Sequence, residues 1–551
     1  MSAVPQMVAG AEVHVNGAPL DVALAQRISE VRVHQNLMLP DSFLIRIADA
    51  GLESIDTHPF AVGAAVEVLL APPAGGASTS LIKGQVVAVE PEFGHGGVVL
   101  AVRGYDQSHA LNRTRVTQTY QNMTAADIAR KVASRNGLTP GTVDSSGPAY
   151  DFVQQNTETD WQFLCRLAAR IDFEVVVTDR SLNFRHAGPG AAGDPIELRF
   201  GDNLQTFRPR VTGVQQVDSV VVRGWDPSAG AVIEATANAP APSDLDSSIG
   251  IARSDVVSAL GGGTVTVADR PVFDSAEAGA LAGSVAARLA NAFVDAEGAC
   301  VGDPKIRAGA RIDVKGIGTR FGGTYTLSSS EHVLRGQRGY QTNFVVSGRS
   351  PRSLVDLMSP AAQRSWGSSL VVGTVTQNTN DPANLGRVRV KYPALGDDTE
   401  GWWARVAGIA AGAERGVLMM PQAGDEVLIG FEHGDPRKPY VLGAVWNAKD
   451  APGSDLVRAD GSFALRSDKE ITATAKGVIT IKSEKDLAIQ TDGKIGQTAQ
   501  GDYTVEGQTV SIKANGSLTV EATGDLTLKG ATVSVQAQGT VSVSGAQVSL
   551  G

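Results

Sequence analysis

Residues 476–551 carry a short repeat that limits the possible folds of this chain more than any other feature. Pairs of residues, nearly all apolar, recur with one residue between the two members, and successive pairs begin 7 or 8 residues apart. Each pair is typical of a short strand with one apolar face, and a fixed short period predicts a repeat architecture. The pairs are Ile479/Ile481, Leu487/Ile489, Ile495/Gln497, Tyr503/Val505, Val510/Ile512, Leu518/Val520, Leu526/Leu528, Val533/Val535, Val541/Val543 and Val548/Leu550.

One copy of this repeat cannot close an apolar interior. Each strand spans only about five residues, so a single chain leaves apolar side chains and backbone edges exposed. Three chains wound round a common axis bury both, because each strand then pairs with strands of its neighbours. We therefore expect residues 476–551 to form a triple-stranded intertwined β-helix, a needle that exists only in the homotrimer. Ten repeats that each advance by one strand spacing give a rod about 50 Å long.

The side chains expected to face the axis of this needle come from the repeated pairs. A flexible tail is disfavoured, because disordered tails lack regular apolar pairs. The shaft of a tail fibre is a stronger alternative, since such shafts also use trimeric β-repeats. The expected core residues are Ile479, Ile481, Leu487, Ile489, Tyr503, Val505, Val510, Ile512, Leu518, Val520, Leu526, Leu528, Val533, Val535, Val541 and Val543.

The chain stops just after the last repeat, so its final residues are expected to lie in the terminal layer of the needle. An exposed apolar trimeric end predicts a protein that covers it. The residues expected at this tip interface are Val548, Ser549, Leu550 and Gly551.

Composition argues against several classes of function. The formal net charge is −10, whereas binding to nucleic acid or to anionic lipid needs a basic surface. Cys165 and Cys300 are the only cysteines, so a disulfide framework or a CxxC zinc site is not expected. The N-terminus lacks the pattern of a signal peptide, and no apolar run approaches roughly 18 residues. We expect synthesis and assembly in the cytoplasm.

Upstream of the repeat, the sequence predicts a mainly β, multidomain chain. Residues 1–365 contain many strand-like runs, and 62 glycines in the whole chain suit short strands and turns. Apolar residues at steps of three and four predict helices near 124–136, 159–171 and 276–293. The stretch 226–270 is rich in Ala, Ser, Pro, Asp and Gly and is predicted to be a loop.

Residues 366–452 predict a small antiparallel barrel of the OB-fold type. Six short β-rich runs follow one another there at a spacing that suits such a barrel. A polar stretch, 453–475, is the expected neck between the barrel and the needle. The six runs are LVVGTVTQN, GRVRVKYP, GWWARVAG, GVLMMP, GDEVLIGFEHGD and YVLGAVWN.

Several segments resemble the VgrG and phage tail spike-hub family. PQAGDEVLIGFEHGDPRKPYVLGAVWN at 421–447 is similar to the OB-fold signature of that family, and GWWARVAG at 401–408 looks like a preceding strand. TETDWQFLCRLAARIDFEVVV and YTLSSSEHVLRGQRGYQTNFVV resemble segments of its hub. The signature residues are Gly424, Asp425, Glu426, Gly430, Glu432, His433, Gly434, Asp435 and Pro436.

The resemblance implies the spike of a contractile injection system. In that family a hub with two similar β-domains per subunit lets three subunits adapt a sixfold inner tube to a threefold needle. The expected partners are two further copies of the chain, tube or tube-initiator and baseplate proteins, a PAAR-like tip protein and effector cargo. The target membrane would be contacted only during firing. The short barrel strands favour the phage-like or extracellular type of particle.

No catalytic, cofactor or metal site is predicted. Glu432, His433 and Asp435 suit the polar turn of a β-hairpin better than a metal site. Trp402 and Trp403 are neighbours in a strand and face opposite ways, so at least one is expected in the core. HExxH, GxSxG and GK[ST] motifs are absent from the sequence. A cell-wall hydrolase and a receptor-binding trimeric tail fibre are the two alternatives to a structural spike.

Overall fold

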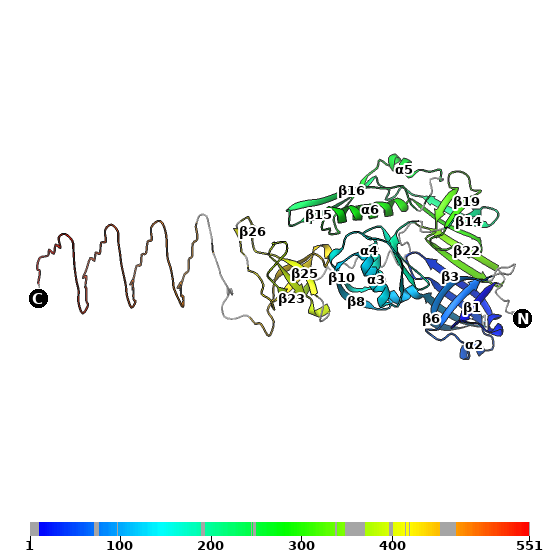
Figure 1. The fold of residues 1–551 in the computed structure, drawn as a ribbon, viewed down its shortest axis with the longest axis horizontal. Helices are drawn as coiled ribbons and strands as arrows, with labels where there is room; N and C mark the ends of the chain where they lie inside the picture. The colour runs from blue at the N-terminus through cyan, green and yellow to red at the C-terminus, as the bar shows by residue number, and fades with distance from the viewer. Residues whose placement is uncertain are drawn as a thin grey trace. The chain divides into compact units, whose positions relative to one another are not determined.

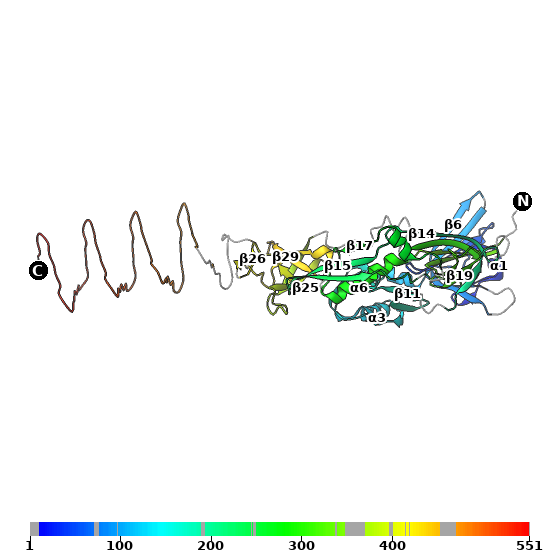
Figure 2. The same ribbon diagram turned by 90° about the horizontal axis from the view of Figure 1, so that it is seen from above.

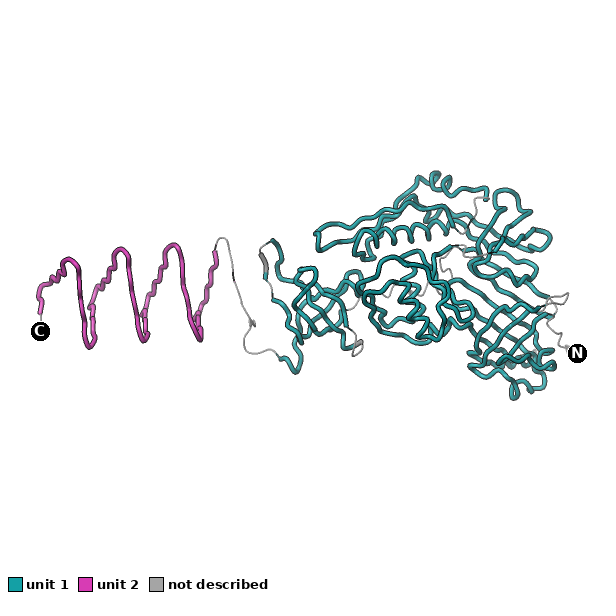
Figure 3. Tube along the Cα trace, in the orientation of Figure 1, with its two compact units in different colours: residues 1–460 teal, residues 461–551 magenta. Residues whose placement is uncertain are grey.

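The computed structural model describes most of the chain. The chain divides into two units, residues 1–460 and residues 461–551 (Figure 3). The first unit is mainly β and multidomain, which confirms the predicted fold class. The described residues are 10–70, 77–95, 97–188, 193–243, 245, 249–336, 339–347, 370–395, 400–413, 415–417, 419–451, 465 and 470–549.

An antiparallel sheet of eleven strands forms the largest part of the first unit (Figure 1). It joins two apolar cores, one around Val31 and Ile45 and the other around Phe344. Strands distant in the sequence meet where β3 pairs with β21, and Arg32 contacts Glu331 there at 3.1 Å. In sheet order the strands are β14 (Leu204–Val211), β18 (Val294–Val301), β22 (Gly339–Val346), β21 (Ser329–Arg335), β3 (Ile28–Asn36), β4 (Ser42–Ala48), β7 (Gly97–Asp106), β6 (Thr79–Gly94), β5 (Ala65–Leu70), β1 (Ala11–Val15) and β2 (Ala18–Pro19).

Two helices, α3 (Ala125–Arg135) and α4 (Asp160–Ala168), share a core with five strands. Thr124 and Asp127 form a capping box at α3, and Thr159 and Gln162 form another at α4, so each helix begins where backbone N–H groups find partners. Cys165 packs against this core as a free thiol, and burial raises its pKa to about 12. The strands are β8 (Arg115–Met123), β9 (Thr139–Val143), β10 (Tyr150–Thr159), β11 (Phe173–Thr178) and β12 (Ser181–His186).

The stretch predicted to be a loop, 226–270, contains regular structure. In this region β16 (Ala231–Asn238) pairs with β15 (Ser219–Asp226) in a hairpin, and β17 (Thr264–Val267) pairs with β15 in parallel. The helix α6 (Ser275–Asn291) lies along this sheet (Figures 1 and 2). Alanines at 235 and 237 pack against the core under α6, and such small residues allow close packing without an apolar signal in the sequence.

The remaining short elements complete the first unit upstream of the barrel. They are α1 (Val22–Ala25), α2 (Glu53–Asp56), η1 (Gln107–Asn112), β13 (Ile196–Arg199), α5 (Arg253–Ala259), β19 (Arg311–Lys315) and β20 (Gly323–Thr326).

Five strands close into the predicted barrel around a core that includes Val388, Ile429 and Val441. None of the described residues of the run GVLMMP belongs to a barrel strand. The first residue of the run lies in the ribbon that β26 (Ala411–Gly412) forms with β27 (Arg415–Gly416), and the run ends at Pro421, which has no N–H to donate. The barrel strands are β23 (Val371–Gln377), β24 (Arg387–Lys391), β25 (Glu400–Val406), β29 (Pro439–Ala444) and β28 (Glu426–Phe431), with η3 (Pro393–Leu395) after β24.

The second unit winds as an open coil, which appears as a wave in two perpendicular views (Figures 1 and 2). Within the described residues 470–549, no strand is formed and no backbone hydrogen bond joins one turn of the coil to the next. The triple-stranded β-helix therefore stays a prediction. Of the predicted neck, 453–475, only residues 465 and 470–475 are described.

Candidate functional site

The signature residues of the barrel gather at the two ends of β28. Gly424 has φ of 102° at the turn before the strand, a conformation that favours glycine. Asp425 closes this turn by accepting from Gln422 N at 2.7 Å, and Glu426 accepts from Asn447 at 3.0 Å. Gly430 lies within the strand. These residues shape the barrel.

The turn after β28 is the predicted polar hairpin turn, which η4 (Glu432–Gly434) forms between two antiparallel strands. His433 and Gly434 both have positive φ, and Pro436 follows them. Glu432 accepts a hydrogen bond from the Tyr440 hydroxyl at 2.8 Å. Asp435 is buried within this polar turn, since only 11% of its side chain is exposed.

Asp435 belongs to a buried ionic network that joins the barrel to the rest of the first unit. Its carboxylate accepts from Arg437 Nη2 at 2.7 Å, and Arg437 Nη1 donates to Glu277 Oε1 of α6 at 2.7 Å. Arg170, just beyond α4, donates to the same Glu277 oxygen at 2.9 Å. Both arginines also donate to the Pro271 carbonyl. Sequence reasoning missed Arg437; its position two residues after Asp435 was the available signal.

The network keeps its charges in spite of burial. Burial alone would raise the pKa of Asp435 and of Glu277, but the positive charges of Arg437 and Arg170 hold both pKa values below their usual range. Burial would likewise lower the pKa of Arg437, and the carboxylates of Asp435 and Glu277 raise it. Buried charges are tolerated when each is paired and hydrogen-bonded, so this cluster fixes the barrel against α4 and α6.

Aromatic side chains extend the same contact. Phe152 of β10 stacks on Trp402 of β25 with ring centroids 5.5 Å apart. Trp403 is only 8% exposed, so one of the two neighbouring tryptophans is in the core, as predicted. A cavity of about 140 Å³ lies beside them, with Trp225 and Phe273 on one wall and barrel residues on the other.

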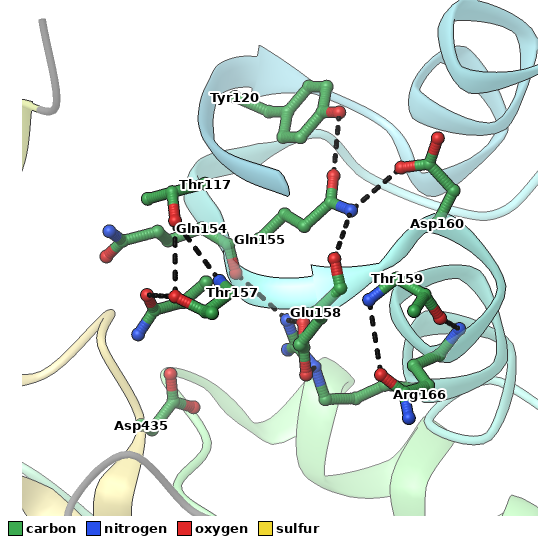
Figure 4. A network of polar contacts seen from close by, with 12 residues as sticks. Thr117, Tyr120, Gln154, Gln155, Thr157, Glu158, Thr159, Asp160, Arg166 and Asp435 are labelled. Carbon is green, nitrogen blue, oxygen red and sulfur yellow. Dashed lines mark hydrogen bonds and ion pairs between the residues drawn. The ribbon is translucent and has the colours of Figure 1, made fainter. Parts of the chain in front are cut away.

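A second polar network lies next to Asp435, on β10 and α4 (Figure 4). Gln155 Nε2 donates to Asp160 Oδ1 at 2.8 Å and to the Glu158 carbonyl at 3.1 Å. Arg166 of α4 pairs with Glu158 at 2.9 Å. These bonds hold the end of β10 against α4, next to the residues that receive the barrel.

Within the described part of the chain, no group of three or more His, Cys, Asp or Glu residues could hold a metal ion. None of the helices described is both long enough and apolar enough to cross a membrane.

The apolar pairs of the repeat are exposed in the single chain. The sixteen expected core residues are between 50% exposed, at Val541, and 72% exposed, at Ile481 and Ile512. Val548 of the expected tip interface is 49% exposed and Ser549 is exposed. Leu550 and Gly551 lie outside the described residues. Apolar surface arranged in this regular way on an isolated chain indicates a protein interface.

Comparison with known proteins identifies the family. The family model of the Type VI secretion system/phage-baseplate injector OB domain matches residues 371–446, which are the barrel. The family model of the Alg8 N-terminal domain matches residues 8–336, more than half of the chain. The chain belongs to the family of VgrG and phage tail spike-hub proteins and carries an Alg8 N-terminal domain. The predicted resemblance is thereby confirmed.

Individual relatives of this spike-hub protein match over short parts. The spike protein VgrG5 of Pseudomonas aeruginosa is 29% identical over 149 residues, which are 26% of this chain and 19% of the relative. VgrG4b of the same species is 43% identical over 67 residues, 11% of this chain and 8% of the relative. The chain thus spans less than a fifth of the length of these relatives. An E. coli protein, c3393, a component of the type VI secretion system, matches at 15% identity with a TM-score of 0.48, covering 79% of this chain and 99% of its own.

Proposed function

We propose that this spike-hub protein is the structural spike of a contractile injection system. Three copies sit at the centre of the baseplate, below the inner tube. Their hubs adapt the sixfold tube to a threefold needle, and contraction of the sheath drives the needle through the target envelope. The protein transmits force, and its functional sites are interfaces.

One observation carries the proposal: the described part of the repeat, residues 476–549, has no interior within one chain. Its apolar pairs are exposed and its backbone forms no ladder among the described residues. Burying one such side chain stabilises a structure by about 1.5–3 kcal/mol, and each chain carries two per repeat. Three entwined copies supply that burial, and the resulting rod has neither a hinge nor a long loop. Such a rod is suited to an axial load.

The junction between barrel and hub supports the same role. At this junction Arg437 makes charge-assisted hydrogen bonds to Asp435 and to Glu277. A barrel joined to the hub by a flexible linker would not need these bonds. A spike that pushes on its needle requires the barrel to keep its position under load. The buried network supplies that resistance.

The proposed partners follow from this position in the machine. They are two further copies of the chain, the inner tube or tube-initiator protein, baseplate proteins, a PAAR-like tip protein at the end of the needle, and effector cargo. Nucleic acid is no partner, and the membrane is contacted only during firing. Assembly takes place in the cytoplasm, on a phage tail-like particle that stays in the cell or is released.

The oligomeric state tests the proposal. Light scattering of the full-length protein should give three times the 57.2 kDa of one chain. A chain ending at Asp460 should fold, retain the barrel and lose most of this association. A monomeric full-length protein would contradict the proposal. Cleavage of peptidoglycan by the purified protein would favour a hydrolase, and glycan binding by the trimer would favour a receptor-binding fibre.

A further inference from the structure

Charged residues of the repeat follow a rule that its apolar core does not require. Two positions on the strand face opposite to the apolar pair carry most of them: the residue just before the pair and the residue just after it. Asp486, Lys494 and Asp502 precede three successive pairs. Glu506, Lys513, Glu521 and Lys529 follow four successive pairs. At these two positions, wherever charges occur in two successive repeats, their signs are opposite.

This alternation serves no contact within one chain. In the described coil of the single chain, none of these seven charged side chains forms an ion pair, and all seven are exposed. The backbone likewise forms no hydrogen bond from one repeat to the next in the described coil. Successive repeats of one chain are therefore not neighbours across a ladder.

Threefold symmetry turns this sequence order into a spatial order. In a symmetric trimer the same repeat of each chain lies at the same height on a different face. From one repeat to the next, each chain moves to the neighbouring face and rises by one strand spacing of about 4.8 Å. The strand above a given repeat is then the following repeat of another chain. On one face, Lys513 of the second chain thus lies directly above Glu506 of the first chain. Glu521 of the third chain lies directly above Lys513.

We propose that these two columns, Asp486–Lys494–Asp502 and Glu506–Lys513–Glu521–Lys529, are inter-chain charge ladders that set the register of three identical chains. This inference rests on the proposed trimeric needle. It adds the rule by which the repeats of different chains pair in that needle. A slip by one repeat between chains places like charges side by side, whereas the apolar pairs alone tolerate such a slip. Like charges directly opposite each other destabilise neighbouring strands, and opposite charges stabilise them.

A single charge reversal tests the ladder against its simplest rival, general solubility. Glu521→Lys places three lysines in one column and should lower the temperature at which the trimer dissociates by several degrees in dilute salt. The loss should shrink in about 1 M salt, where screening acts within about 3 Å. Asp525→Lys is the matched control, because its column neighbours in adjacent repeats, Ser517 and Thr532, are neutral. Equal losses in both variants would overturn the proposal.

Reversal of the whole ladder keeps the alternation and gives a second, independent test. The fourfold variant E506K/K513E/E521K/K529E should recover most of the dissociation temperature lost in Glu521→Lys. Coexpressed with differently tagged wild-type chains, it should form mainly unmixed trimers, whereas random assembly gives roughly three mixed trimers in every four. Random mixing, or no recovery, in an intact trimer overturns the ladder and leaves the needle standing. A monomeric wild type overturns both.

Discussion

Arg437 of the barrel donates a hydrogen bond of 2.7 Å to Glu277 of α6, a residue 160 positions earlier in the chain. The same guanidinium also binds Asp435, so one cation neutralises two buried carboxylates from two parts of the first unit. This contact gives the barrel a fixed place beside α4 and α6.

Replacement of Arg437 by methionine should destabilise the first unit strongly. The substitution leaves Glu277 and Asp435 buried with fewer partners, which typically costs about 3–5 kcal/mol. Thermal unfolding of a chain ending at Asp460 measures the loss. Arg405→Met is the matched control. Arg405 makes a long hydrogen bond of 3.4 Å to the Tyr440 hydroxyl and a cation–π contact with the same ring, so its loss should cost about 1 kcal/mol. Similar losses in both variants would contradict this role of the network.

The same network predicts a loss of stability in acid. The pKa values of Asp435 and Glu277 are lower in the folded protein than their ordinary values of 3.8 and 4.5. A carboxyl group whose pKa is depressed by folding stabilises the fold fully when the pH is above its ordinary pKa. That contribution is lost as the pH falls through the pKa that the group has in the folded protein. Urea unfolding at pH 7 and pH 3 should show the decline. In Arg437→Met the decline should be smaller, because the partner cation is gone.

Asp41 and Asp106 predict the opposite dependence on pH. Burial and the neighbouring Asp106 raise the pKa of Asp41 to about 7, and burial raises that of Asp106 to about 6. The folded state then binds more protons than the unfolded state, so these groups reduce stability as the pH rises from about 4 to 7. Asp41→Asn keeps an acceptor for Asn36 N and should stabilise the protein at pH 8 more than at pH 5. Replacement of the exposed Asp56 by asparagine serves as the control. If Asp41→Asn changed the free energy of unfolding equally at both pH values, the prediction would be refuted.

An aspartate in the predicted needle core should prevent trimer formation. Val535→Asp places three charges at the axis of the needle, where they have no partner and no water. Ser534→Asp introduces the same side chain one position earlier, on the opposite face of the strand, and should be tolerated. Light scattering of both variants distinguishes the faces. Trimers of equal stability would show that the pairs do not face a common axis.

The parts of the fold that depend on neighbours in sequence could be predicted. Thr124 and Asp127 specify the start of α3 by a local hydrogen-bonding pattern, and the alternating strands of the barrel carry their own apolar face. The hairpin of β15 and β16 could not be found, because Ala235 and Ala237 gain their role only from α6 above them. Small residues fit a tight interface and a loop equally well.

The candidate site was predictable only in part, for a related reason. The signature around Asp435 marked a hairpin turn, which is a local feature. Arg437 binds Glu277, which Arg170 also binds, and both of these residues lie far away in sequence with no spacing that connects them to the turn. For the repeat, the sequence shows the apolar faces, and the partners that would bury them are other copies of the chain.

The most direct test of the account is a reconstruction of the purified full-length protein by electron cryo-microscopy without imposed symmetry. Residues 476–551 should appear as three chains wound round one axis, with Ile512 and Val520 of every chain turned inward. A particle with one chain in this region, or three chains that run separately with these side chains in solvent, would contradict the needle.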